Sequence, residues 1–222
     1  MQIRFPGLLC LGLLVAVQAN AEDGFFSKVS LLGGVSVGQL SLDRDSFASP
    51  TGLQGFEATA TAWTPAIGLE FNRYLSAELG RFNGGSPSQQ TLISAPAPPL
   101  VAGVYSVETD EIANSAWLAS AMGTLPINDS VSVYARGGFL RWKTTTRIER
   151  RDDLVDSSLT ILSTSYQRFQ AKNSGNDPFF GFGFALNIDN ALLRLEYDVS
   201  KINEADARYI SLGVAWRFKP WD

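Results

Sequence analysis

The sequence predicts an all-β protein, an eight-stranded antiparallel up-and-down β-barrel that crosses a membrane. Three observations support this prediction. Large apolar residues alternate with small or charged ones at the period of a β-strand, and helical periodicity is hard to find. The chain opens with a secretory signal, which takes it out of the cytoplasm. The connections between the alternating segments are short and long in turn, as in barrels of bacterial outer membranes.

The first 21 residues have the three parts of a signal peptide in order. Arg4 supplies a short positive region, Leu8 to Val17 is an apolar run, and Ala19-Asn20-Ala21 is a small-x-small cleavage pattern. The run is too short for a spanning helix. We therefore predict a cleaved signal peptide over 1–21 and one barrel domain over 22–222. Cys10 is removed with the signal, which leaves no thiol for a disulfide, a nucleophile or a thiolate metal site.

Eight segments carry strand-like alternation. In chain order they are 26–41, 59–72, 74–82, 114–125, 130–146, the two halves of 178–202, and 207–218. The fourth segment, "NSAWLASAMGTL", is ambiguous in phase because Ala, Ser and Gly occupy both faces. Each segment is close to the 9–11 or so residues that a tilted strand needs to cross a bilayer.

The stretch "PFFGFGFALNIDNALLRLEYDVSKI", from Pro178 to Ile202, shows the pattern best. In its first half, Phe alternates with Gly; in its second half, apolar residues alternate with Arg, Glu and Asp, and the two halves turn at Asp189-Asn190. In lipid every backbone polar group needs a partner, which a closed barrel provides without a free edge. The Phe and Leu face is therefore expected to meet lipid, and the Gly, Arg and Glu face to line a narrow lumen.

The connections indicate which end of the barrel faces outward. Three are short turns, at 72–74, 126–129 and 189–191. Three are expected to be long outer loops, at 42–58, 84–113 and 147–177. The last outer connection, at 203–205, is a short exception.

Eight charged residues on the inward phase are the candidate site. They are Lys28, Glu70, Glu78, Arg136, Arg194, Glu196, Asp198 and Arg217. An eight-stranded lumen is just wide enough to be filled by side chains, and charges inside it must pair. We expect a plug of ion pairs, and the alternative is a gated pore for protons or small ions.

The hairpin "GFGFALNIDNALLRLEYDVSKI" and the last strand "YISLGVAWRF" resemble the OmpA/OmpX-like family of small outer-membrane barrels. The chain departs from full OmpA-type proteins, because it ends about where the barrel closes and we expect no peptidoglycan-binding domain. The resemblance implies an insertion signal at the end of the last strand, in Trp216 and Phe218, although Trp221 in the following "KPWD" is an alternative.

Composition excludes several function classes. With 18 Lys and Arg against 22 Asp and Glu the chain is acidic, and it has no basic block that would favour nucleic acid. It has no histidine, so the common nucleophile–base pairs cannot be assembled. The acids of "ERRDDLVD" (149–156) are expected to lie in a solvated loop, and the spacing of Asp152, Asp153 and Asp156 matches no calcium loop. No cofactor or metal is predicted.

The function expected from the sequence is that of a non-enzymatic outer-membrane barrel, monomeric, serving membrane integrity or surface interaction through its outer loops. The expected partners are outer-membrane lipid and lipopolysaccharide, the barrel-assembly machinery during insertion, and a host or surface ligand. Three alternatives stay open at this stage. They are a small channel, a histidine-free enzyme, and a soluble barrel of lipocalin kind, which would fill its lumen with apolar residues rather than charges.

Overall fold

The computed structural model describes residues 29–49, 52–94, 103–156, 158 and 160–218. Within this part of the chain, nine β-strands follow one another and no helix is long and apolar enough to cross a membrane. The strands are β1 (Ser30–Ser49), β2 (Gly52–Asn72), β3 (Leu75–Asn83), β4 (Ser88–Ser94), β5 (Gly103–Pro126), β6 (Val131–Val155), β7 (Ile161–Ile188), β8 (Ala191–Ile202) and β9 (Ala205–Phe218).

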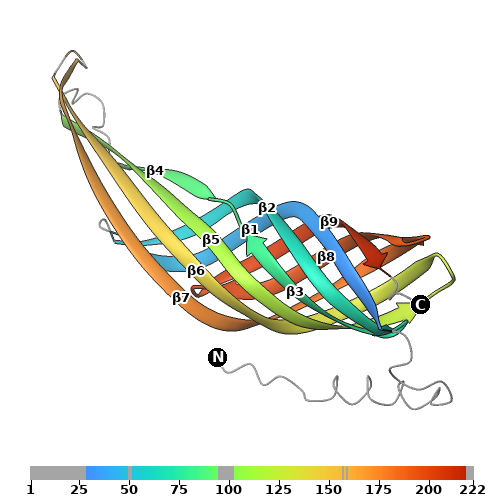
Figure 1. Ribbon diagram of the computed structural model, residues 1–222. Helices are drawn as coiled ribbons and strands as arrows, with labels where there is room; N and C mark the ends of the chain where they lie inside the picture. Colours follow the sequence, from blue (N-terminus) through green and yellow to red (C-terminus); the bar gives the residue numbers. More distant parts are fainter. Residues whose placement is uncertain (1–28, 50–51, 95–102, 157, 159, 219–222) are drawn as a thin grey trace.

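Eight of the nine strands form a closed antiparallel ring. Their order is β3-β2-β1-β9-β8-β7-β6-β5, and pairing of β3 with β5 closes the ring. The first and last strands, β1 and β9, pair from Leu31–Phe218 to Asp43–Asp206. Figure 1 shows the resulting barrel with strongly tilted strands. The predicted eight-stranded up-and-down barrel is confirmed. Strand β4 is an additional strand that was not predicted, and it pairs with β5 beyond the end of β3.

The predicted short turns gather at one end of the barrel, which we call the short-turn end (Figure 1). The Asn72 side chain accepts hydrogen bonds from the amides of Tyr74 and Leu75, and Asn128 does the same for Ser130 and Val131. Such Asx turns close a chain reversal without needing long loops. The third turn places Asp189 at a positive φ of 51°, as tight hairpin turns require.

The prediction that 42–58 and 147–177 are loops is wrong. The predicted loop 84–113 is wrong over 88–94 and 103–113, which are strand, and its residues 95–102 lie outside the described part. Only residues 50–51 separate β1 from β2. Strand β6 continues to Val155, and β7 begins at Ile161. Strands β5, β6 and β7 therefore rise well beyond the barrel as a sheet, which we call the extension (Figure 1). The predicted strands stop where the apolar face stops, whereas a strand ends where its backbone pairing ends.

Cross-strand contacts hold the extension together beyond the barrel. Arg147 of β6 pairs with Glu111 of β5 at 3.3 Å, and Arg168 of β7 pairs with Glu149 of β6 at 2.8 Å. Runs of Thr, such as Thr144 to Thr146, have high strand propensity without being apolar. The extension is thus a polar continuation of the barrel wall.

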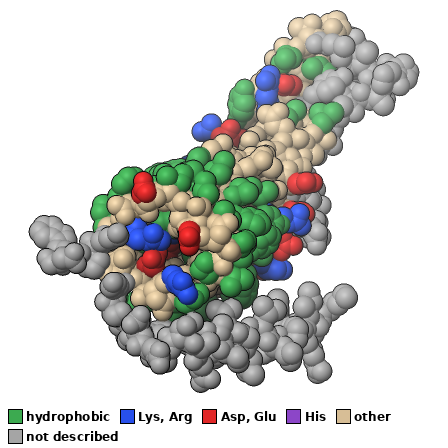
Figure 2. Space-filling view, turned by 90° about the vertical axis from the view of Figure 1, so that its right-hand side faces the viewer, with side chains coloured by type: hydrophobic (Ala, Val, Ile, Leu, Met, Phe, Trp, Pro, Cys, Tyr) green, Lys and Arg blue, Asp and Glu red, His purple; other side chains and the backbone are tan. Residues whose placement is uncertain are grey.

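The outer face of the ring carries an apolar belt. On β7, Phe180, Phe182 and Phe184 point outward with more than half of their surface exposed. The belt runs from Phe180 to Ile188 on β7 and from Ile210 to Phe218 on β9. Each stretch measures about 27 Å along the strand, which is about 21 Å along the barrel axis at a strand tilt of about 40°. Figure 2, seen from the short-turn end, shows charged side chains in the mouth of a largely hydrophobic wall. These dimensions fit a transmembrane barrel, whose apolar band is about 25 Å tall.

The structure also settles the phase of the fourth predicted strand, which lies in β5. Trp117, Ala119 and Ala121 face outward, and Ala116 and Met122 face the lumen. Small residues had hidden this alternation in the sequence.

Candidate functional site

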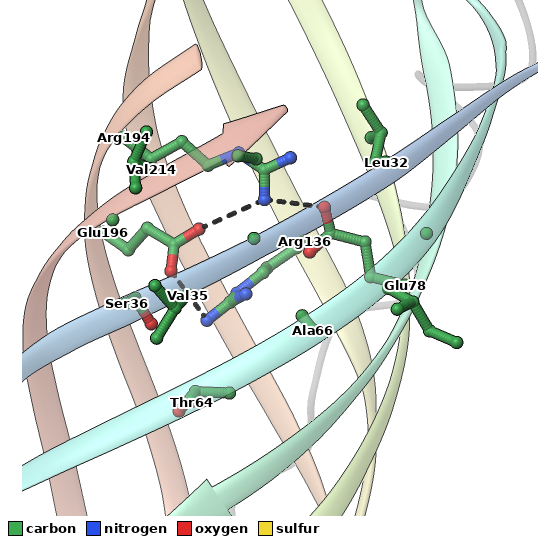
Figure 3. A pocket seen from close by; sticks show the side chains of 15 residues that line it. Leu32, Val35, Ser36, Thr64, Ala66, Glu78, Arg136, Arg194, Glu196 and Val214 are labelled. Carbon is green, nitrogen blue, oxygen red and sulfur yellow. Dashed lines mark ion pairs between the residues drawn. The ribbon is translucent and has the colours of Figure 1, made fainter. Parts of the chain in front are cut away.

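Side chains of opposite charge meet inside the barrel. An Arg194 guanidinium nitrogen lies 2.6 Å from a Glu78 carboxylate oxygen and 3.8 Å from one of Glu196. An Arg136 nitrogen lies 3.3 Å from the other Glu196 oxygen, and Arg136 also pairs with Asp198. The five side chains are at most 10% exposed, and we call them the charge network. Figure 3 shows four of its members, Glu78, Arg136, Arg194 and Glu196, with the ion pairs between them dashed.

The ring order gives the Arg194–Glu78 pair a special position. Arg194 belongs to β8 and Glu78 to β3, and four pairing steps separate these strands in either direction around the eight-membered ring. The two residues therefore come from opposite walls, and their ion pair crosses the lumen.

Glu196 is the centre of the charge network. Besides its two arginines, it accepts a hydrogen bond of 2.8 Å from the Tyr134 hydroxyl and one of 3.5 Å from the Ser211 hydroxyl. Buried carboxylates need such a full set of donors, because an unsatisfied buried charge is very costly. The donors come from β6, β8 and β9, so the site forms only when these strands are assembled.

The Phe–Gly alternation of β7 makes room for this network. Gly181 pairs with Asp198 and Gly183 with Glu196, both facing the lumen. A Cβ atom on Gly183 would lie 2.6 Å from the Tyr134 hydroxyl oxygen, and one on Gly181 would overlap the Asp198 carboxylate. Glycine is needed here because the charged and aromatic side chains of neighbouring strands lie directly over the β7 backbone.

A second ion pair lies closer to the short-turn end. Arg217 of β9 and Glu70 of β2 are 2.9 Å apart. They line a vestibule of about 660 Å³ that opens at this end and that Arg194 and Tyr134 also border. Of the eight predicted lumen charges, seven are thus found in ion pairs inside the barrel, and Lys28 lies outside the described residues.

Apolar side chains fill the half of the lumen next to the extension, and they were not predicted from the sequence. Leu40, Phe82, Leu140 and Phe179 are buried there, and the ring of Phe82 meets that of Tyr209 edge-on at 5.3 Å. The signal was present: on β6, Leu140 and Trp142 continue the same inward phase as Tyr134 and Arg136. The lumen therefore has an open vestibule, a charge network and an apolar layer in succession.

Two small cavities lie beyond the vestibule. The cavity beside the charge network and the cavity within the apolar layer each measure about 30 Å³, which is room for about one water molecule.

The acidic run of 149–156 forms the tip of the extension. Asp152 pairs with Arg150 at 2.8 Å and Asp153 with Arg151 at 3.0 Å. Asp156 accepts hydrogen bonds from the Ser158 side chain and from the Thr160 amide, and these hold the pKa of its carboxyl below the usual range. No cluster suited to a metal ion occurs in the described part of the chain.

The predicted insertion residues lie on the lipid-facing phase of β9. Trp216 and Phe218 are each about half exposed at the short-turn end, and Phe218 pairs with Leu31 of β1. Aromatic residues are common at this level of membrane barrels.

The family model described as "Outer membrane protein beta-barrel domain" matches residues 7–218. The chain belongs to this family. It is therefore a bacterial outer-membrane β-barrel, as the resemblance to small OmpA/OmpX-like barrels implied. Comparison with curated protein sequences gives no significant match.

Several solved structures are similar to the chain. The attachment invasion locus protein Ail of Yersinia pestis, in complex with the heparin analogue sucrose octasulfate, is 14% identical, with a TM-score of 0.46 over 85% of this chain and 99% of Ail. Neisserial surface protein A is 14% identical, with a TM-score of 0.42 over 85% of this chain and 97% of its own. The N-terminal barrel of Pseudomonas aeruginosa OprF is 12% identical, with a TM-score of 0.38 over 84% and 99%. At these levels the similarity carries no argument about function.

Proposed function

We propose that this outer-membrane barrel is non-enzymatic, has a closed lumen, and acts at the cell surface through the extension while supporting membrane integrity. The charge network and the apolar layer serve the barrel as its internal packing. Trp216 and Phe218 serve as the signal for the barrel-assembly machinery, and the extension faces the outside of the cell.

One observation carries the surface role. Strand β7 pairs with β6 from Ile161 onward, but with β8 only from Phe179 to Ile188. Among the described residues, 161–178 therefore have one edge without a neighbouring strand. Along this stretch Tyr166 is 70% exposed and Phe169 53%. An exposed strand edge with aromatic side chains is suited to pairing with an extended segment of another protein.

The partner that fits this edge is a host or surface protein offering an extended strand. Backbone hydrogen bonds would provide affinity, and contacts with Tyr166 and Phe169 would provide selectivity. In this role, the free edge of β7 takes the place of the outer loops that the sequence predicted.

Shortening the extension tests the proposal. Arg150 and Gln167 are pairing partners, so replacing residues 151–166 by a two-residue Asn-Gly turn keeps the register of β6 and β7. We expect cells with this variant to lose adhesion to host surfaces while their barrel stays folded and their resistance to detergents is unchanged. Unchanged adhesion would count against the surface role.

A gated passage for small cations is the second candidate, favoured by one feature of the charge network. It contains three carboxylates, Glu78, Glu196 and Asp198, against the two arginines, and the vestibule leads directly to it. Conductance in planar bilayers separates this candidate from the closed barrel.

A further inference from the structure

At the outer border of the apolar belt, the outward-facing residues of β3 and β6 change from apolar to basic. On β3, Arg81 follows Leu79, and on β6, Arg141 and Lys143 follow Phe139. Arg141 and Lys143 are exposed and Arg81 is half-buried. Because these residues keep the lipid-facing phase, their charges lie where acyl chains give way to headgroups.

The strand register brings these residues into one row. Arg81 is the pairing partner of Trp117 on β5, and Trp117 is the pairing partner of Arg141 on β6. The guanidinium carbon of Arg81 lies 5.2 Å from the centre of the Trp117 ring. Tryptophan favours the membrane interface, and stacking on it holds the guanidinium at that level. We call Arg81, Trp117, Arg141 and Lys143 the basic row.

The basic row has no acidic counterpart of its own. In the described parts of β3, β5 and β6, the outward-facing neighbours of the row include Asn83, Ser115 and Ala119, and none is a carboxylate. The opposite side of the barrel differs, because there Lys201 of β8 lies 3.5 Å from Asp206 of β9. The three cations of the basic row are thus left to take a negative charge from outside the protein.

We propose that the basic row binds the phosphate groups of lipid A in the outer leaflet. A phosphate offers the planar guanidinium two acceptor oxygens, and lipid A carries its phosphates at the border of its acyl chains. The acyl chains would lie along the belt below, against Leu79 and Phe139. The choice of the outer leaflet rests on the proposed orientation, with the extension outside the cell.

Lipid retention in nanodiscs tests the site. The test variant is Arg81→Gln with Arg141→Gln, and the matched control is Lys201→Gln with Arg208→Gln, which removes two cations at the same border on the opposite strands β8 and β9. Each protein is placed in phosphatidylcholine nanodiscs with bisphosphorylated lipid A, with dephosphorylated lipid A, with phosphatidylglycerol, or with inorganic phosphate. Retained lipid is measured after gel filtration, and heat-modifiable gel mobility verifies folding.

We expect wild type and control to enrich bisphosphorylated lipid A equally, and the test variant to do so about 30-fold less, from two lost cations near an anionic surface. Arg141→Lys keeps the charge but loses the two-oxygen contact, so its enrichment should lie between those of wild type and the test variant. Equal enrichment by the test variant, or equal loss in the control, would overturn the site. Arginine-dependent enrichment of phosphatidylglycerol, or release of lipid A by inorganic phosphate, would overturn the choice of lipid A. If only the proposed orientation is wrong, labelling of intact cells would reveal it and the nanodisc result would be unchanged.

Discussion

Removing Arg194 is the sharpest test of the charge network. Its partner Glu78 has no other ion pair among the described residues, whereas Glu196 keeps Arg136 and Tyr134. Arg194→Ala therefore leaves one buried carboxylate uncompensated and opens the obstruction between opposite walls. Both consequences can be measured on the same protein.

The stability change follows from the burial of Glu78, whose side chain is 6% exposed. Breaking a buried ion pair by removing one partner costs about 3–5 kcal/mol. The vestibule borders Arg194, so water can enter and the lower end, about 3 kcal/mol, is expected. Removing both partners, with Glu78→Ala added, should cost less than the sum of the single changes, with a coupling of about 1–3 kcal/mol.

Reversible unfolding by urea in lipid bilayers gives these free energies, and planar bilayers give the conductance. Wild type should show little or no steady conductance. Arg194→Ala combined with Arg217→Ala should conduct with a preference for cations, since carboxylates then remain unpaired. Strictly additive stability losses, or a large and steady conductance of wild type, would refute the closed charge network.

Three further outcomes follow from the same structure. A membrane-impermeant reagent added to intact cells should label a cysteine placed at Asp152, at the tip of the extension, but not one at Asn190; labelling at Asn190 would invert the orientation. Leu195→Arg should impair assembly by about 2–4 kcal/mol, as expected for arginine on the lipid face, while Glu196→Gln should leave insertion nearly intact; equal effects on heat-modifiable mobility would contradict the assigned faces. Gly183→Ala should destabilise by about 1–3 kcal/mol because the new methyl group meets the Leu195 carbonyl oxygen and the Tyr134 ring, and unchanged urea unfolding would contradict this close packing.

The alternation of residues was sufficient to predict the barrel and its two faces. A period of two assigns a face to each residue wherever large and small side chains differ clearly, as in Phe182 and Gly183. The pairing of arginines with carboxylates could be expected because a narrow lumen leaves no other partner. Which arginine meets which carboxylate depends on the ring order, and Arg194 and Glu78 face each other only once the whole ring is closed.

The extension and the apolar layer were missed for related reasons. Polar alternation in Thr- and Ser-rich stretches such as 161–176 gives the same composition as a loop, so only backbone pairing distinguishes the two. The inward-facing residues of β6 become apolar at Leu140. An inward apolar residue indicates an apolar layer only when apolar residues of other strands are known to face it.

The Arg194–Glu78 ion pair across the lumen also constrains the order of assembly. Glu78 and Arg194 lie on strands far apart in the chain, and neither belongs to a hairpin that contains the other. Local hairpins form before such distant contacts, because closing long stretches of chain is entropically costly. The lumen charges should thus stay hydrated until the last strands meet, and dehydration and ring closure become one late event. Removing Arg194 should then accelerate unfolding while leaving the rate of insertion almost unchanged.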